Sequence, residues 1–191
     1  MNIPLHIASR GGHTDAMRLL IDAGANINAK SNDGCTSLHW ASCGGHTDAV
    51  QLLIDTGANV NEETTYKQIP LHYASCGGHT DAIRLLIGAG VDINANDVCK
   101  WTPLHKASWN GHTCAIQLLI DAGADINVKD NDGWAPLHST SYKGHTDAVR
   151  LLIDAGADIN AESVKKWTPL EYATRKRHTD VIRLLKNHGG Q

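Results

Sequence analysis

The sequence repeats itself every 33 residues, and this period constrains the fold more than any other feature. One series of histidines recurs at this spacing: His6, His39, His72, His105 and His138. A second series does the same: His13, His46, His79, His112, His145 and His178. No insertion or deletion breaks the phase over six repeats: 1–30, 31–63, 64–96, 97–129, 130–162 and 163–191. The chain is therefore expected to be an array of similar small elements.

The residue pattern of each repeat predicts two short helices. In the fourth repeat, Thr102 can cap the first helix and Pro103 suits its first position. Thr113 is then expected to cap a second helix, whose apolar residues recur at helical spacing over 115–120. Gly123 is expected to end that helix in a left-handed conformation. Two such helices cannot bury their apolar faces alone, so an all-α solenoid of stacked repeats is predicted.

Several residues that recur in phase resemble the ankyrin-repeat family. In the fourth repeat they are Thr-Pro-Leu-His at 102–105, Ala107, Gly-His at 111–112, Leu-Leu at 118–119 and Gly-Ala-Asp-Ile-Asn at 123–127. The pattern covers essentially the whole chain. The resemblance implies a single domain over 1–191, built as a curved stack of helix pairs with β-hairpin fingers. It also implies a scaffold that binds another protein through its concave helix and finger face, without catalysis.

The turn glycines, Gly34 and Gly133, are replaced in other repeats by Lys67, Lys100 and Lys166. A lysine forced to positive φ costs about 1 kcal/mol, so these three fingers are expected to adopt a different turn.

The ends of the array depart from the pattern as well. The first repeat lacks the start of its finger, and the last stops shortly after Gly189. The ends are therefore either divergent caps or the edges of a longer array, and uncovered Ile3, Leu5 and Leu20 favour a longer array.

Charge is unevenly distributed along the chain, whose net charge is −3. Residues 1–162 carry 10 basic and 18 acidic residues, a net of −8, whereas residues 163–191 carry 7 and 2, a net of +5. This balance argues against nucleic-acid binding along the whole length.

The apolar runs are too short for a membrane span, and no leader pattern is visible. Five cysteines, an odd number, favour a reducing intracellular compartment, the cytoplasm or the nucleus, and a monomer is expected.

Histidines and cysteines are predicted to be structural. The first-series ring can bond the threonine hydroxyl three residues before it, as Thr36 precedes His39 and Thr102 precedes His105. The second-series ring is expected to be buried against backbone carbonyls. The sequence lacks Cys-x-x-Cys, His-Glu-x-x-His and acidic calcium-loop patterns, so no metal, cofactor or catalytic residue is predicted. Cys43 and Cys76 occupy equivalent positions about 8–10 Å apart, too far for a disulfide. They are therefore expected to be free surface thiols.

Aromatic residues form the candidate binding site. Trp101, Trp134 and Trp167 form a ladder at the finger bases; Trp109, Tyr142 and Arg175 form a second series; Trp40, Tyr73 and Tyr172 form a third, interrupted by Lys106 and Ser139. Ten residues are predicted to bind a partner: Trp101, Trp109, Trp134, Tyr142, Trp167, Tyr73, Trp40, Tyr66, Lys106 and Arg175. The centre is expected to be one patch of Trp101, Trp109, Trp134 and Tyr142, rimmed by Lys100, Lys106, Asn110, Asp132 and Lys143. Packing of the tryptophan ladder against the neighbouring fingers is an equally weighted alternative.

Two further functions fit the repeats. The array could be the regulatory or targeting part of a larger enzyme. It also resembles the substrates of an asparagine hydroxylase, because three asparagines follow Asp-Ile with a leucine eight residues before them. The candidate hydroxylation sites are Asn94, Asn127 and Asn160.

Overall fold

A computed structural model describes residues 4–191 of the chain, and these residues form twelve α-helices. The first helices of the six pairs are α1 (Pro4–Arg10), α3 (Ser37–Gly44), α5 (Pro70–Gly77), α7 (Pro103–Asn110), α9 (Pro136–Lys143) and α11 (Pro169–Lys176). The second helices are α2 (Thr14–Asp22), α4 (Thr47–Asp55), α6 (Thr80–Gly88), α8 (Thr113–Asp121), α10 (Thr146–Asp154) and α12 (Thr179–Asn187). None of the described residues is in a β-strand, so the fingers are hairpin-shaped loops. The predicted all-helical repeat fold is confirmed.

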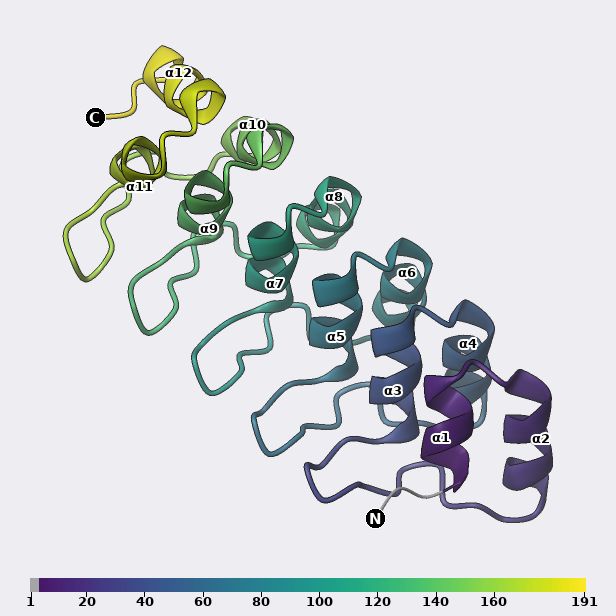
Figure 1. The fold of residues 1–191 in the computed structure, drawn as a ribbon. Helices are drawn as coiled ribbons and strands as arrows, with labels where there is room; N and C mark the ends of the chain where they lie inside the picture. Colours follow the sequence, from purple (N-terminus) through teal and green to yellow (C-terminus); the bar gives the residue numbers. More distant parts are fainter. Residues whose placement is uncertain (1–3) are drawn as a thin grey trace. The chain divides into compact units, whose positions relative to one another are not determined.

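The chain divides into two compact halves, residues 1–98 and 99–191. In each half the first helices lie side by side in one layer and the second helices in another (Figure 1). In the C-terminal half, α9 packs between α7 and α11, and α10 packs between α8 and α12. The fingers project from the ends of the first-helix layer. That all six repeats form one domain remains a prediction.

The core of each half lies between its two helix layers. Leu104 and Ala107 of α7 and Ile116 and Leu119 of α8 are fully buried, as the helical spacing of apolar residues requires.

At the first repeat, the prediction of an uncovered apolar end needs correction. Leu5 is 1% exposed and Leu20 is half-buried, because α1 and α2 pack on α3 and α4. Leu19 is the outward residue of α2, at 72% exposed. Ile3 lies outside the described residues.

Helix ends follow the sequence signals, with one exception. Thr102 caps α7, because its hydroxyl accepts the His105 backbone N–H at 3.4 Å. Gly123 is left-handed, with φ 93°, as predicted. The expectation that Thr113 caps the second helix is wrong: Thr113 is the first residue of α8, and the residue before it holds the cap position. The Thr113 hydroxyl instead points back to the carbonyl of Gly111 at 3.5 Å.

All fingers use the same left-handed turn, so the prediction of a different turn at the lysines is wrong. Lys67, Lys100 and Lys166 have φ of 56°, 60° and 61°. Lys166 donates its backbone N–H to the Ser163 carbonyl at 2.9 Å, and Gly133 makes the equivalent bond at 3.0 Å. These closing hydrogen bonds hold the turn and offset the strain of about 1 kcal/mol at each lysine.

Gly133 offers a test of how tightly neighbouring fingers pack. A Cβ at Gly133 would lie 2.8 Å from the Val164 backbone nitrogen, whose N–H donates to the Asp132 carbonyl at 2.9 Å. Gly133→Ala should therefore lower the free energy of unfolding by about 1 kcal/mol because of the positive φ. Displacement of the next finger should lower it by roughly a further 1–3 kcal/mol. Gly123→Ala meets nothing within 4 Å and should lose only the first amount. Urea denaturation compares the two variants, and equal losses would contradict the finger contact.

Candidate partner-binding site

The first-series histidines hold the ladder tryptophans in place. The His105 ring accepts the Thr102 backbone N–H on Nδ1 at 3.2 Å, so Nε2 carries the proton and donates to the Trp134 carbonyl at 2.9 Å. Nδ1 also lies 2.9 Å from the Thr102 hydroxyl, as predicted. His138 reaches the Trp167 carbonyl in the same way at 3.2 Å. Each ring thus caps its own helix and fixes the base of the next finger.

The second-series histidines hold the ends of the first helices. Nε2 of His145 bonds the Trp109 carbonyl at 3.1 Å, and Nε2 of His178 bonds the Tyr142 carbonyl at 2.9 Å. The structural role is as predicted, but no ring of this series is fully buried, because the rings lie at the ends of the helices: His13 is exposed and the other five are half-buried. Within residues 4–191, no group of three or more His, Cys, Asp or Glu side chains is placed to hold a metal ion.

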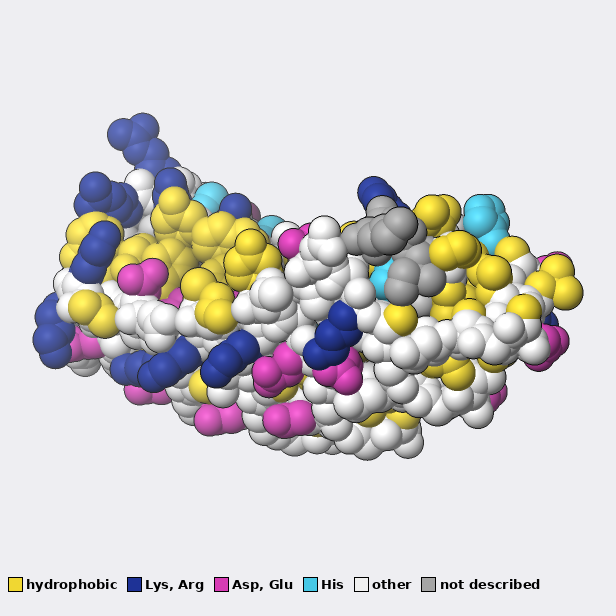
Figure 2. All heavy atoms as spheres, turned by 90° about the horizontal axis from the view of Figure 1, so that it is seen from below, with side chains coloured by type: hydrophobic (Ala, Val, Ile, Leu, Met, Phe, Trp, Pro, Cys, Tyr) yellow, Lys and Arg dark blue, Asp and Glu magenta, His cyan; other side chains and the backbone are white. Residues whose placement is uncertain are grey.

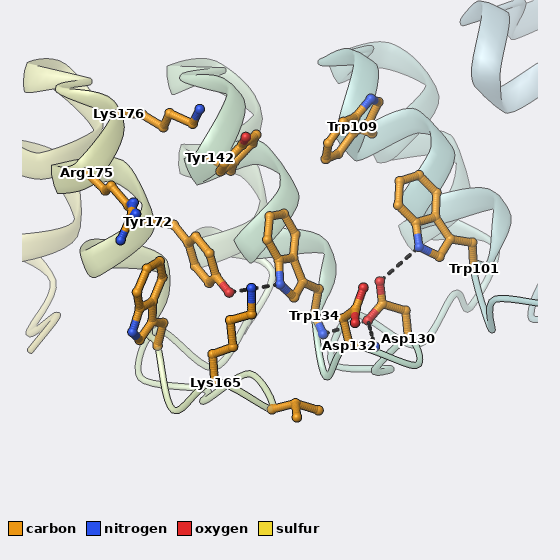
Figure 3. A pocket seen from close by; sticks show the side chains of 12 residues that line it. Trp101, Trp109, Asp130, Asp132, Trp134, Tyr142, Lys165, Tyr172, Arg175 and Lys176 are labelled. Atoms are coloured by element: carbon orange, nitrogen blue, oxygen red, sulfur yellow. Dashed lines mark hydrogen bonds between the residues drawn. The ribbon is translucent and has the colours of Figure 1, made fainter.

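Four of the predicted residues form one cluster of rings (Figure 3). The Trp109 ring stacks on Tyr142, with centroids 5.9 Å apart and planes at 16°. Trp109 also lies 5.5 Å from Trp101 and 6.3 Å from Trp134, and Trp134 lies 5.3 Å from Tyr142. The cluster joins the C-terminal turns of α7 and α9 to the bases of two fingers, so the expected patch is assembled.

A fifth ring, missed as a site residue, extends the cluster. Tyr172 of α11 lies with its ring 4.5 Å from Trp134 and 5.2 Å from Trp167. Its hydroxyl accepts the Trp134 indole N–H at 3.0 Å, and the side chain is only 4% exposed. The sequence places Tyr172 in the series of Trp40 and Tyr73, but nothing in that series indicates contact with the ladder.

These rings surround an open pocket of about 490 Å³ in the C-terminal half, which we call the aromatic pocket. Six predicted residues line it: Trp101, Trp109, Trp134, Tyr142, Trp167 and Arg175. Asp132, predicted for the rim, also lines it. Five unpredicted residues complete it: Asp130, Val164, Lys165, Tyr172 and Lys176.

The ladder tryptophans both pack and remain open. The Trp101 indole N–H donates to Oδ2 of Asp130, on the neighbouring finger, at 2.9 Å. Trp101, Trp134 and Trp167 are nevertheless only half-buried. The indole N–H groups of Trp101 and Trp134 thus bond side chains of the neighbouring repeat, as the packing alternative predicts. The ladder rings also line the aromatic pocket, and binding of a partner by them stays a prediction.

Cations lie over the faces of the pocket rings. Nζ of Lys106 is 4.8 Å from the Trp101 ring centroid, and Nζ of Lys143 is 4.1 Å from that of Trp109. The hydrogen bond and charge of Lys176 lower the pKa of Tyr142. Cation–π contacts of this exposed kind contribute about 0.5–1 kcal/mol each. Figure 2 shows hydrophobic side chains gathered beside lysines and arginines at its left.

Four predicted residues do not line the aromatic pocket: Lys106 in the C-terminal half, and Trp40, Tyr66 and Tyr73 in the N-terminal half. Tyr66 is 59% exposed. Trp40 carries the Arg10 guanidinium 5.5 Å from its ring centroid. Tyr73 packs edge-on against a first-series histidine, and burial raises the pKa of its hydroxyl.

The cysteines and asparagines occupy the positions that the repeat implies. None of the five cysteines, all within residues 4–191, forms a disulfide, and Cys43 and Cys76 are exposed, as predicted. The candidate hydroxylation sites Asn94, Asn127 and Asn160 are exposed. Oδ1 of Asn127 accepts the Asp158 backbone N–H at 2.8 Å, so this side chain links two repeats.

The fold defines a class of protein: stacked helix pairs with projecting fingers. A family model described as "Ankyrin repeats (3 copies)" matches residues 2–64, 61–130 and 105–191. The chain belongs to the ankyrin-repeat family, and ankyrin repeats are generally protein–protein interaction modules.

Among solved structures, the chain is similar to the crystal structure of the human ASB11 ankyrin repeat domain. The TM-score is 0.94 and the sequences are 29% identical, over 100% of this chain and 85% of that one. Comparison with curated proteins finds no match. No helix within residues 4–191 has the length and apolar character needed to cross a bilayer.

Proposed function

We propose that this chain is a non-catalytic scaffold that binds a partner protein through the aromatic pocket. The observation that carries the proposal is the stacked Trp109–Tyr142 pair at the wall of an open cavity of about 490 Å³. Tryptophan, tyrosine and arginine dominate binding hot spots, and an aromatic centre with a charged rim is the usual anatomy of an interface. The proposal includes that this protein is intracellular and monomeric and that it binds neither nucleic acid nor membrane.

Truncation of either ring tests the proposal. Trp109→Ala and Tyr142→Ala should each weaken partner binding by about 2 kcal/mol or more, because each removes an anchor side chain. Gln117→Ala is the matched control, since Gln117 is exposed on α8 and bonds only Asp121. Proteins recovered from cell extract by each immobilised variant are compared by quantitative mass spectrometry, with circular dichroism to confirm folding. Folded variants that recover the same proteins as the parent would exclude the pocket as the binding surface.

The exposure of Asn94, Asn127 and Asn160 favours hydroxylation as an additional property of the same array. Intact mass after expression in cells that contain an asparagine hydroxylase would show the added oxygen. A regulatory or targeting role within a larger enzyme would use the same surface, and the coding sequence that flanks the two ends would show it.

A further inference from the structure

Four basic side chains at the aromatic pocket have no carboxylate partner within residues 4–191. Lys143, Arg175 and Lys176 point their charges at aromatic rings, at 4.1, 4.7 and 4.4 Å from the ring centroids. Lys165 extends from the finger of α11 beside Tyr172 (Figure 3). Elsewhere in the same half, Lys166 pairs with a glutamate at 2.9 Å. The pocket thus gathers cations that no carboxylate of the described residues neutralises.

The acidic groups that line the pocket do not neutralise this rim. Asp130 is 8% exposed, and its carboxylate accepts the Trp101 indole N–H at 2.9 Å and the backbone N–H groups of Trp134 and Asp132 at 2.8 and 2.9 Å. It therefore holds the finger together. Asp132 is the exposed acid of the lining, opposed by four cations.

We propose, building on the function proposed above, that the partner presents an acidic segment with an apolar side chain between its carboxylates. The apolar side chain fills the space among Trp109, Trp134 and Tyr142. The carboxylates on either side meet the unpaired cations of the rim. Cation–π contacts hold three of these cations near the pocket before the partner arrives, which reduces the entropy lost on pairing.

Ring occupancy favours an acidic protein over a nucleic acid. Single-stranded nucleic acids stack bases on open aromatic faces. Here Lys143 lies over Trp109, Lys176 over Tyr142 and Arg175 over Trp167. A basic or methylated-lysine segment is disfavoured as well, because four cations would repel it.

The first experiment selects short random peptides from a display library on the full chain, with Trp109→Ala screened in parallel. Recovery of peptides with an apolar residue flanked by Asp or Glu, lost on Trp109→Ala, is the expected result. Neutral or basic peptides lost on Trp109→Ala would overturn the acidic segment while the proposed function stands. If no selected peptide distinguishes the parent chain from Trp109→Ala, this result would count against the pocket itself. If the chain binds fluorescent oligouridylate and Trp109→Ala does not, the ligand is a nucleic acid and the inference of an acidic protein segment is overturned.

The second experiment measures how much the carboxylates of the peptide contribute to its affinity. The selected peptide should bind about tenfold tighter than its copy with glutamines for glutamates, since two partly exposed charge pairs are lost. The double variant Arg175→Gln/Lys176→Gln should lose most of this ratio. The matched control Arg150→Gln/Lys186→Gln removes two exposed charges away from the pocket and should keep the ratio. An unchanged ratio in the first double variant would overturn the assignment.

Discussion

Removal of residues 163–191 should lower the stability of the C-terminal half by about 3 kcal/mol or more. The last repeat covers its neighbour, because α11 packs on α9 and α12 packs on α10. The hydrogen bonds across this contact that would be lost include Val164 N–H to the Asp132 carbonyl, His138 to the Trp167 carbonyl and His178 to the Tyr142 carbonyl. Each such bond contributes about 1 kcal/mol, before the loss of apolar burial is counted.

Urea denaturation followed by tryptophan fluorescence measures this effect, since four of the five tryptophans lie in the C-terminal half. The chain ending at Asn187 is the control. It retains α12 and loses two exposed bonds of Asn160, one exposed bond of Thr168 and the bonds of residues 188–190 to the end of α12, so its midpoint should change little. A chain ending at residue 162 with the midpoint of the full chain would show that the last repeat is not a stabilising cap.

Acidification from pH 6.5 to 4 should destabilise the protein through its buried histidines. Burial lowers the pKa of His39 and of His138 from 6.5 to about 4, although backbone bonds to Gln68 and Trp167 oppose the shift. Between these pH values the unfolded chain binds a proton at each position and the folded chain does not. The free energy of unfolding therefore falls as pH falls, by about 3 kcal/mol for each histidine at the end of the window.

The geometry explains why the neutral ring is required. Nδ1 of His39 accepts the Thr36 backbone N–H at 3.1 Å, and Nε2 lies 3.1 Å from the Gln68 carbonyl. A proton on Nδ1 of His39 would place this N–H opposite the Thr36 backbone N–H, so that two donors would face each other. Glu62, whose pKa is lowered mainly by its hydrogen bond from Lys30, loses its charge only below its ordinary 4.5. The loss of stability between pH 6.5 and 5 therefore belongs to histidines.

Urea denaturation at several pH values measures the fall in stability, and NMR of the histidine ring protons assigns it. The resonances of His39 and His138 should not shift between pH 7 and 5. Titration of either ring near 6.5, or a free energy of unfolding that stays constant over this range, would contradict the prediction.

Local sequence signals failed where hydrogen bonds to backbone carbonyls, or packing between helices, decided the conformation. The lysines at the finger turns adopt the glycine conformation, because the turn is closed by backbone bonds that any residue except proline can make. Thr113 lost its predicted cap because the carbonyl of Gly111 accepts its hydroxyl. Leu5, predicted to be uncovered, is buried by the neighbouring helices.

The sequence by itself determined the repeat, the helix pairs and the patch of Trp101, Trp109, Trp134 and Tyr142, because a fixed period brings equivalent positions together in adjacent repeats. Only the tertiary structure decided the rest of the aromatic pocket. Trp134 bonds a residue 38 positions later, Tyr172, and Trp101 bonds one 29 positions later, Asp130. Neither separation is the repeat length, so these pairs depend on how far each side chain reaches across the gap between repeats.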